Sequence, residues 1–173
     1  MVGRTKYAVL DKAFLPKMIE QCVDDVDRGL IYTLYFTGMH GSLLESISEK
    51  NLIRHGDKHY LEWSRTKSKR TMNTQVPKVK IPQIEAFLKS KKKTMRHYNY
   101  LLKAIGEGAG FEGLSTMTFR HSRCVRMLRD EKRPVTEVAQ EMGCTIDVVT
   151  RNYAKMRNDQ LASEHDLDEE YAE

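Results

Sequence analysis

The sequence predicts a mainly α-helical domain with one small antiparallel β-sheet. Along most of the chain, apolar residues recur every three or four positions, which is the spacing of one face of a helix. Only residues 51–79 alternate between apolar and polar side chains around short turn signals, as strands do. The 173 residues, 40% of them hydrophobic and 31% charged, suit one compact domain. We expect this domain to span residues 1–160 and an acidic, mobile tail to occupy residues 161–173.

Three helices are expected before the strands. The first covers about residues 16–23, because proline is favoured in a first helical turn. The second covers residues 25–37, where the apolar run LIYTLYF predicts a central position, and Gly38 is its expected C-terminal cap. A short third helix follows in GSLLESI, with Ser42 as N-cap and Glu45 completing a capping box.

The alternating stretch predicts a sheet with a basic tip. A His-Gly-Asp turn at 55–57 precedes the strand-like HYLEW, the charged turn TKSKR and an extended segment that runs to about residue 79. Antiparallel pairing of these segments places four cations close together at one end, Arg65, Lys67, Lys69 and Arg70.

Helices are predicted for the rest of the chain. Pro82 opens one, and another runs from about 94 to 105 until the glycines of GEGAGFEG interrupt it. Three more are expected at about 117–129, 135–142 and 145–159, and Pro134 and Gly143 separate them.

The charge distribution suggests an anionic partner. The net charge is +5, yet the last ten residues carry six carboxylates and no Lys or Arg. Without them the chain carries roughly +11, which favours DNA or RNA as partner, although a merely well-solvated basic surface is equally consistent with charge alone. The acidic tail is expected to compete for the basic face.

Composition argues against a membrane, secreted or metal-dependent protein. No window approaches the roughly 18 apolar residues of a membrane span, and the N-terminus lacks the apolar run of a signal peptide, so we expect an intracellular, cytoplasmic protein. No metal or other cofactor is expected, because the cysteines are scattered and three of the histidines lack the spacing of metal ligands: Cys22, Cys124, Cys144, His55, His59 and His97.

Two distant segments carry the residues that suggest chemistry. In TFRHSRCVRML, Arg120 and Arg123 are one helical turn apart, so both guanidinium groups can point to one side, and Arg126 extends the row. A solvated helix face is the plainer interpretation of these arginines. In VAQEMGCTIDVVTRNYAKM, a helix and a glycine turn lead to a second helix that bears Tyr153.

Together with YTLYFTGMHGSLLESI, these segments resemble the catalytic domain of the tyrosine recombinases, the family of phage-type integrases and Xer-like enzymes. The first block is similar to a family helix that ends in Thr-Gly-x-Arg. TMTFRHSRCVRML resembles the family's His-x-x-Arg-His segment, and MGCTIDVVTRNYAKM resembles Leu-Gly-His leading to Thr-x-x-Tyr. The order of the blocks agrees, and the resemblance covers nearly the whole chain. It implies the tyrosine-recombinase catalytic-domain fold.

The resemblance also implies an activity, site-specific DNA recombination or integration by strand cleavage and rejoining. Tyr153 would attack a phosphodiester to form a 3′-phosphotyrosyl intermediate, without a metal. Arg120 would clamp the phosphate, and Lys67, or alternatively Lys69, would act as general acid. Further DNA contacts are expected from cations around this site: Arg65, Lys69, Arg70, Arg123 and Arg151. Double-stranded DNA is thus the implied partner.

The family further implies an assembly and an origin. Its members act as tetramers on paired DNA sites, often by passing a C-terminal segment to a neighbour, which here would follow about Asn158. A prokaryotic, viral or plasmid-borne mobile element is the implied source.

Three positions depart from the family pattern. His40 stands where the family has its first arginine, Met117 where it has the histidine before Arg120, and Cys144 where a histidine or tryptophan follows the glycine. A protonated His40 would offer one charged hydrogen bond without the arginine fork, and it would equally suit a helix cap. The chain is therefore a slow recombinase, a recombinase disabled at His40, or a relic that binds DNA without cutting it.

A non-enzymatic alternative is a helix-turn-helix regulator within residues 134–156. In this interpretation Ala139 lies at the contact between the two helices, Gly143 lies in the turn, and Val148 and Val149 pack the second helix back. Base contacts would then come from four residues of that helix, Thr145, Asp147, Thr150 and Arg151. An RNA-binding or purely structural protein has support from charge alone.

Overall fold

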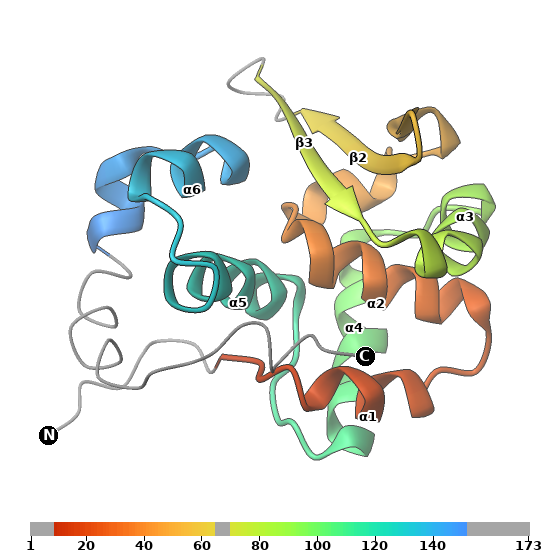
Figure 1. The fold of residues 1–173 in the computed structure, drawn as a ribbon. Coiled ribbons are helices and arrows are strands. Elements are labelled where there is room, and N and C mark those ends of the chain that lie inside the picture. The colour runs from red at the N-terminus through yellow and green to blue at the C-terminus, as the bar shows by residue number, and fades with distance from the viewer. Residues whose placement is uncertain (1–8, 65–69, 152–173) are drawn as a thin grey trace, which may run out of the picture.

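The computed structural model describes residues 9–64 and 70–151, and it shows a helical body that carries a three-stranded antiparallel sheet (Figure 1). The mainly α fold with a small antiparallel sheet is thus confirmed. The longer helices are α1 (Phe14–Glu20), α2 (Asp25–Thr37), α3 (Ile81–Lys89), α4 (Met95–Ala109), α5 (Thr116–Arg129) and α6 (Val135–Met142). Three short 3-10 helices are η1 (Gly41–Glu45), η2 (Glu49–Asn51) and η3 (Lys78–Lys80). Residues 146–151 are also helical.

Helix α2 is central, as its apolar run predicts. Asp24 caps its first turn by accepting a hydrogen bond of 3.0 Å from the backbone N–H of Asp27. Its apolar side chains lie in the main core, and the helix contacts both α3 and α5. The backbone of Gly38 has φ +59°, the left-handed conformation of a helix C-cap, so the predicted end of the helix is confirmed.

The sheet consists of β1 (Leu52–His55), β2 (Lys58–Ser64) and β3 (Thr71–Val76) in that order. The last pair of the second hairpin joins Ser64 to Thr71, so residues 65–70 connect the two strands. Met72, Thr74 and Val76 alternate inward along β3 and are buried, and β3 contacts α2 and α6. Of the predicted basic tip, Arg70 is described and exposed, whereas Arg65, Lys67 and Lys69 lie outside the described residues.

Several predicted boundaries are wrong, and each has a local cause. Helix α4 continues through Gly106 and Gly108 to Ala109, because Gly106 is packed tightly: a Cβ on it would lie 2.6 Å from the Cβ of Leu114. Helix α1 ends at Glu20, and Val23 beyond it is 87% exposed. The strand that was expected to reach Val79 ends at Val76, where Pro77 leads into η3.

The buried apolar residues form two clusters. The larger one joins α1, α2, the sheet, α3 and α4, and its largest fully buried side chains include Phe87 and Phe119. The smaller one lies between α5, α6 and Val149 of the last described helical residues. Helix α5 contributes to both clusters, so it connects the two parts of the molecule.

Candidate catalytic site

Arg120 on α5 connects three segments that the sequence places far apart. The helix starts with a capping box, in which the backbone N–H of Ser115 donates to Thr118 Oγ1 at 3.1 Å. One turn on, Arg120 donates from Nη1 to the carbonyl of Gly38 at 3.1 Å and from Nη2 to the carbonyl of Met142 at 2.7 Å. The ends of α2 and α6 therefore meet at this half-buried guanidinium.

His40 lies two residues beyond that first carbonyl and caps η1. Its Nδ1 accepts a hydrogen bond of 3.2 Å from the backbone N–H of Ser42 and lies 2.8 Å from Ser42 Oγ. The capping alternative for His40 is thus confirmed, and Ser42 as the N-cap is wrong. Because Nδ1 accepts from the backbone, the neutral ring carries its proton on Nε2.

Glycine at position 41 brings η1 against the start of α5. A Cβ on Gly41 would lie 2.6 Å from Oγ1 of Thr116, a contact too close for any side chain. Met117 follows Thr116 and is 41% exposed. The segments that bear His40 and Met117 are therefore packed together, and Glu45 of η1 accepts the backbone N–H of Met95 at 2.8 Å instead of completing the predicted capping box.

The glycine turn after α6 places the third unusual position. Gly143 has φ +64°, and Cys144 then donates its backbone N–H to the carbonyl of Ala139 at 3.0 Å. The Cys144 side chain is half-buried, and Thr145 Oγ1 caps the following helical residues by accepting from Val148 N–H at 3.3 Å. Arg151 in that stretch is exposed. Tyr153 lies outside the described residues.

Three of the four arginines of α5 differ in their partners: Arg120, Arg123 and Arg126. Arg120 and Arg123 both reach the C-terminal half of α6, as their spacing of one turn predicts, whereas Arg126 turns to α2. There it donates to the carbonyl of Tyr35, and its guanidinium carbon lies 3.8 Å from the centroid of that ring. Arg123 is only 9% exposed, so a solvated face is the wrong description of it.

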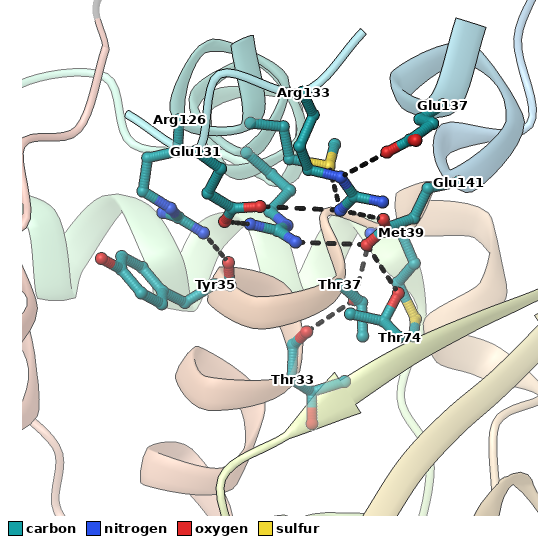
Figure 2. A network of polar contacts seen from close by, with 12 residues as sticks. Thr33, Tyr35, Thr37, Met39, Thr74, Arg126, Glu131, Arg133, Glu137 and Glu141 are labelled. Carbon is teal, nitrogen blue, oxygen red and sulfur yellow. Dashed lines mark hydrogen bonds and ion pairs between the residues drawn. The ribbon is translucent and has the colours of Figure 1, made fainter. Parts of the chain in front are cut away.

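A network of ion pairs joins Glu131, Glu137 and Glu141 to Arg133 (Figure 2), and Arg123 also takes part in it. Arg123 pairs with Glu131 at 2.5 Å and with Glu141 at 3.1 Å. Arg133 pairs with the same two carboxylates and with Glu137 at 3.4 Å. Burial alone would lower the pKa of Arg133, but the charges of Glu141 and Glu131 and the hydrogen bonds to Glu141 and Glu137 raise it above its ordinary value.

Sequence reasoning missed this network, although part of its signal is present. Arg133, Glu137 and Glu141 are spaced by four, the interval at which side chains on a helix meet. Nothing in that spacing indicates the partner from α5, because Arg123 reaches it through the tertiary fold. Glu141 and Arg133 are therefore residues of the site region that only the structure identifies.

The described residues show neither a metal site nor a membrane helix. No group of three His, Cys, Asp or Glu within 9–64 and 70–151 is arranged to hold a metal ion. Over the same residues, no helix combines the length and the apolar character that crossing a bilayer requires.

The architecture described above is the tyrosine-recombinase catalytic-domain fold. No protein-family model and no curated protein matches the sequence. Among solved structures, the XerH site-specific recombinase bound to its palindromic difH substrate superposes with a TM-score of 0.70 at 17% identity, over 91% of this chain and 53% of XerH. This chain thus spans about half the length of XerH. The XerA recombinase gives 0.71 at 11% identity, over 91% of this chain and 66% of XerA.

The catalytic domain of bacteriophage HP1 integrase is similar to this chain over nearly the full length of both. It superposes with a TM-score of 0.65 at 16% identity, and the match covers 96% of each chain. At such identities these comparisons establish the fold.

Proposed function

We propose that this chain is the catalytic domain of a tyrosine-type site-specific recombinase or integrase that cleaves and rejoins double-stranded DNA. The observation that carries the proposal is the position of Arg120, which joins the segment of His40 to the turn of Cys144 within this fold. These are the three blocks by which the sequence resembles the family. Their meeting at one guanidinium supports a shared site.

The proposed chemistry is one phosphoryl transfer and its reversal. The phenol oxygen of Tyr153 forms a bond to phosphorus, the bond from phosphorus to the 5′ oxygen breaks, and that oxygen takes a proton from Lys67, or alternatively Lys69. Arg120 stabilises the charge on the nonbridging oxygens. Its two carbonyl bonds fix where the guanidinium lies before DNA binds, so little reorganisation is needed during reaction.

His40, Met117 and Cys144 weaken this machinery. Because His40 Nδ1 accepts from the backbone of Ser42, the neutral ring has a single N–H donor, whereas an arginine would donate through a fork. Losing one such contact costs on the order of 10²- to 10³-fold in rate. Met117 donates no hydrogen bond, and a thiol at position 144 is a weak donor. We therefore propose a slow enzyme.

DNA contacts are proposed for exposed cations at the edges of the site. Arg70 and Arg151 are exposed in the structure, and Arg65 and Lys69 belong to the same connection between β2 and β3 as Arg70. Arg123 is not proposed to contact DNA directly, since its guanidinium group already pairs with two carboxylates, Glu131 and Glu141. Because these contacts are to phosphates, we expect affinity to fall steeply with salt. Assembly as a tetramer on paired sites belongs to the same proposal.

A covalent-trapping assay tests the proposal. A duplex nicked near the scissile phosphate loses a short fragment on cleavage, so the protein–DNA adduct cannot religate and appears on a denaturing gel. We expect a slow adduct from the unsubstituted chain and none from Tyr153→Phe. His40→Arg is expected to accelerate adduct formation on the order of 10²- to 10³-fold.

The outcomes separate the candidate functions. An adduct that persists in Tyr153→Phe refutes the proposed nucleophile. An adduct only from His40→Arg identifies a recombinase disabled at one position. Salt-sensitive DNA binding without an adduct from either chain refutes the enzymatic proposal and favours a DNA-binding protein.

One observation favours that second candidate, a helix-turn-helix binder. Thr145, Asp147, Thr150 and Arg151, the residues expected to contact bases, are all exposed. Val149 is fully buried and holds the helix against α6, as predicted, but Val148 is 40% exposed and does not pack as predicted. A footprint that Arg151→Ala relaxes at one base position would support this function.

A further inference from the structure

One carboxylate, Glu141, lies where α5, α6 and β3 meet (Figure 2). Its side chain is 11% exposed. One oxygen accepts from Arg123 Nη2 at 3.1 Å and lies 3.5 Å from Thr74 Oγ1, and the other oxygen pairs with Arg133. Glu141 thus contacts a helix, a loop and a strand at once.

The negative charge of Glu141 compensates the positive charges of Arg123 and Arg133. Arg123 and Arg133 bring two positive charges to the same region, and Arg123 is buried. A buried guanidinium that loses its carboxylate is strongly unfavourable, because it cannot regain water without moving. Removal of the negative charge therefore breaks the ion pair between Arg123 and α6, whereas Arg123 keeps its pair with Glu131 and Arg133 keeps its pairs with Glu131 and Glu137.

The strand side of this contact leads to the proposed proton donor. Thr74 is 3% exposed, and its hydroxyl is the group that β3 directs at Glu141. β3 begins at Thr71, which pairs with Ser64 of β2, and the connection between these two residues contains Lys67. The position of β3 relative to α6 thereby affects where that connection begins and ends.

The helix side leads to Arg120. Met142, whose carbonyl accepts from Arg120 Nη2 at 2.7 Å, directly follows Glu141. A Cβ on Gly38, the other anchor of Arg120, would lie 2.8 Å from the Cβ of Arg123, so the stem of Arg123 packs beneath that turn. One anchor of Arg120 thus directly follows Glu141 in the chain, and the other packs against Arg123, which Glu141 contacts.

We propose that Glu141 is a positioning residue, which holds the β2–β3 hairpin in register with α6 so that Lys67 delivers its proton to the 5′ oxygen of the phosphate on Arg120. The inference rests on the proposed function. Glu141 does not touch the DNA; it acts through Thr74 on one side and through Arg123 and Arg133 on the other.

The test compares two leaving groups in the trapping assay. One nicked duplex has the ordinary 5′ bridging oxygen, and the other has sulfur at that position. Alkoxide departure needs a proton, whereas a thiolate departs without one, because thiols ionise near pH 8.5. A residue that positions the proton donor changes only the rate with oxygen. A residue that merely stabilises the fold changes both rates equally.

Two variants and a matched control carry the test. Glu141→Gln keeps the shape of the side chain but removes its charge. Thr74→Val removes only the hydroxyl and leaves both arginine pairs intact, so it decides the question if Glu141→Gln does not fold. Glu137→Gln removes a carboxylate from the same helix whose side chain is 55% exposed and which pairs with Arg133 alone within the described residues.

We expect Glu141→Gln to lower the oxygen-to-sulfur rate ratio about tenfold and Thr74→Val to lower it about threefold, since small misplacement of a reacting group is costly. Glu137→Gln is expected to leave the ratio unchanged. An unchanged ratio in both test variants, or an equal loss in Glu137→Gln, overturns the inference while the proposed function stands. No adduct on either duplex, from the unsubstituted chain or from His40→Arg, refutes the proposed function, and the inference falls with it.

Discussion

The arginines of α5 show how surroundings assign different tasks to one side-chain type. Arg120 is half-buried and bonds to two backbone carbonyls, which holds the ends of two helices together. Arg123 is buried among carboxylates. Arg126 is 5% exposed and stacks on Tyr35. A lysine would provide neither the fork nor the flat face, so these positions are not equivalent to ordinary basic surface residues.

The three cysteines also differ in their surroundings. Burial, and next the charge of Asp27, raise the pKa of Cys22 to about 11, and its Sγ donates to the carbonyl of Met18 at 3.3 Å. At pH 8 only roughly one such thiol in a thousand is ionised, and the thiolate is the reactive form. Cys144 is half-buried and lies near the candidate site.

We therefore predict that Cys144 reacts first with iodoacetamide at pH 8 and that Cys22 reacts at least about tenfold more slowly. Mass mapping of labelled peptides over time measures both rates. In concentrated urea the difference should vanish, because unfolding removes the burial. Cys22 labelling ahead of Cys144 in the folded chain contradicts the prediction.

At the scale of elements, the turn after α2 is the most constrained part of the site. Gly38 combines a positive φ with a close approach to Arg123, and a Cβ there would also lie 3.0 Å from Met142 Cε. Gly56, in the turn between β1 and β2, has φ +63° and nothing within 4 Å of a built Cβ. Both glycines have a positive φ, but only Gly38 is also tightly packed, so substitutions at the two positions distinguish the cost of backbone strain from the cost of overpacking.

We predict that Gly56→Ala lowers the free energy of unfolding by about 1 kcal/mol, the cost of a left-handed alanine. Gly38→Ala is expected to lower it by roughly 2 to 4 kcal/mol, because overpacking adds to that cost. Urea unfolding of both variants measures the difference. Equal losses would show that Arg123 and Met142 move aside without cost.

The elements that carry their own end signals could be predicted from the sequence. The bounds of α2 and α6 agree with expectation, since Asp24 and Gly38 delimit one, and Pro134 and Gly143 delimit the other. Helix α4 was predicted too short, because the local rule for glycine cannot register that Leu114 needs the space beside Gly106.

Only those features of the candidate site that depend on the spacing of nearby residues could be predicted from the sequence. The spacing of Arg120 and Arg123 indicates a shared direction, and the structure directs both to α6. The contact between Thr74 of β3 and Glu141 joins residues 67 positions apart, and the local spacing of residues in the sequence cannot predict such a contact. The identity of the cap on η1 also depended on a backbone geometry that favours His40 over Ser42.

At the scale of the whole molecule, His121 links stability to pH. It lies on α5 between Phe119, which belongs to the larger hydrophobic cluster, and Cys124, which belongs to the smaller one, and it is 9% exposed. Burial lowers its pKa below the ordinary 6.5, so the unfolded chain binds a proton at this residue before the folded chain does. Stability from this group is thus complete above pH 6.5 and falls as the pH drops toward the lowered folded value.

We predict that the free energy of unfolding decreases between pH 7 and pH 5.5 and that His121→Asn flattens this decrease. The exposed His97 supplies the control, because His97→Asn should keep the slope of the unsubstituted chain. Urea titrations at several pH values give the slopes. A slope that His121→Asn leaves intact assigns the pH dependence to other groups.

The earliest described residues are tied to one of the last helices. The backbone N–H of Leu10 donates to Ser122 Oγ at 2.8 Å, Leu10 is 1% exposed, and Val9 packs on the smaller cluster. A ribosome adds about 5 to 20 residues per second, so the 112 positions between these partners correspond to roughly 6 to 22 seconds of synthesis. Throughout that interval the backbone N–H of Leu10 and the side chain of Val9 lack the partners that they have in the folded chain, so this first segment can complete its contacts only after α5 and α6 have been made.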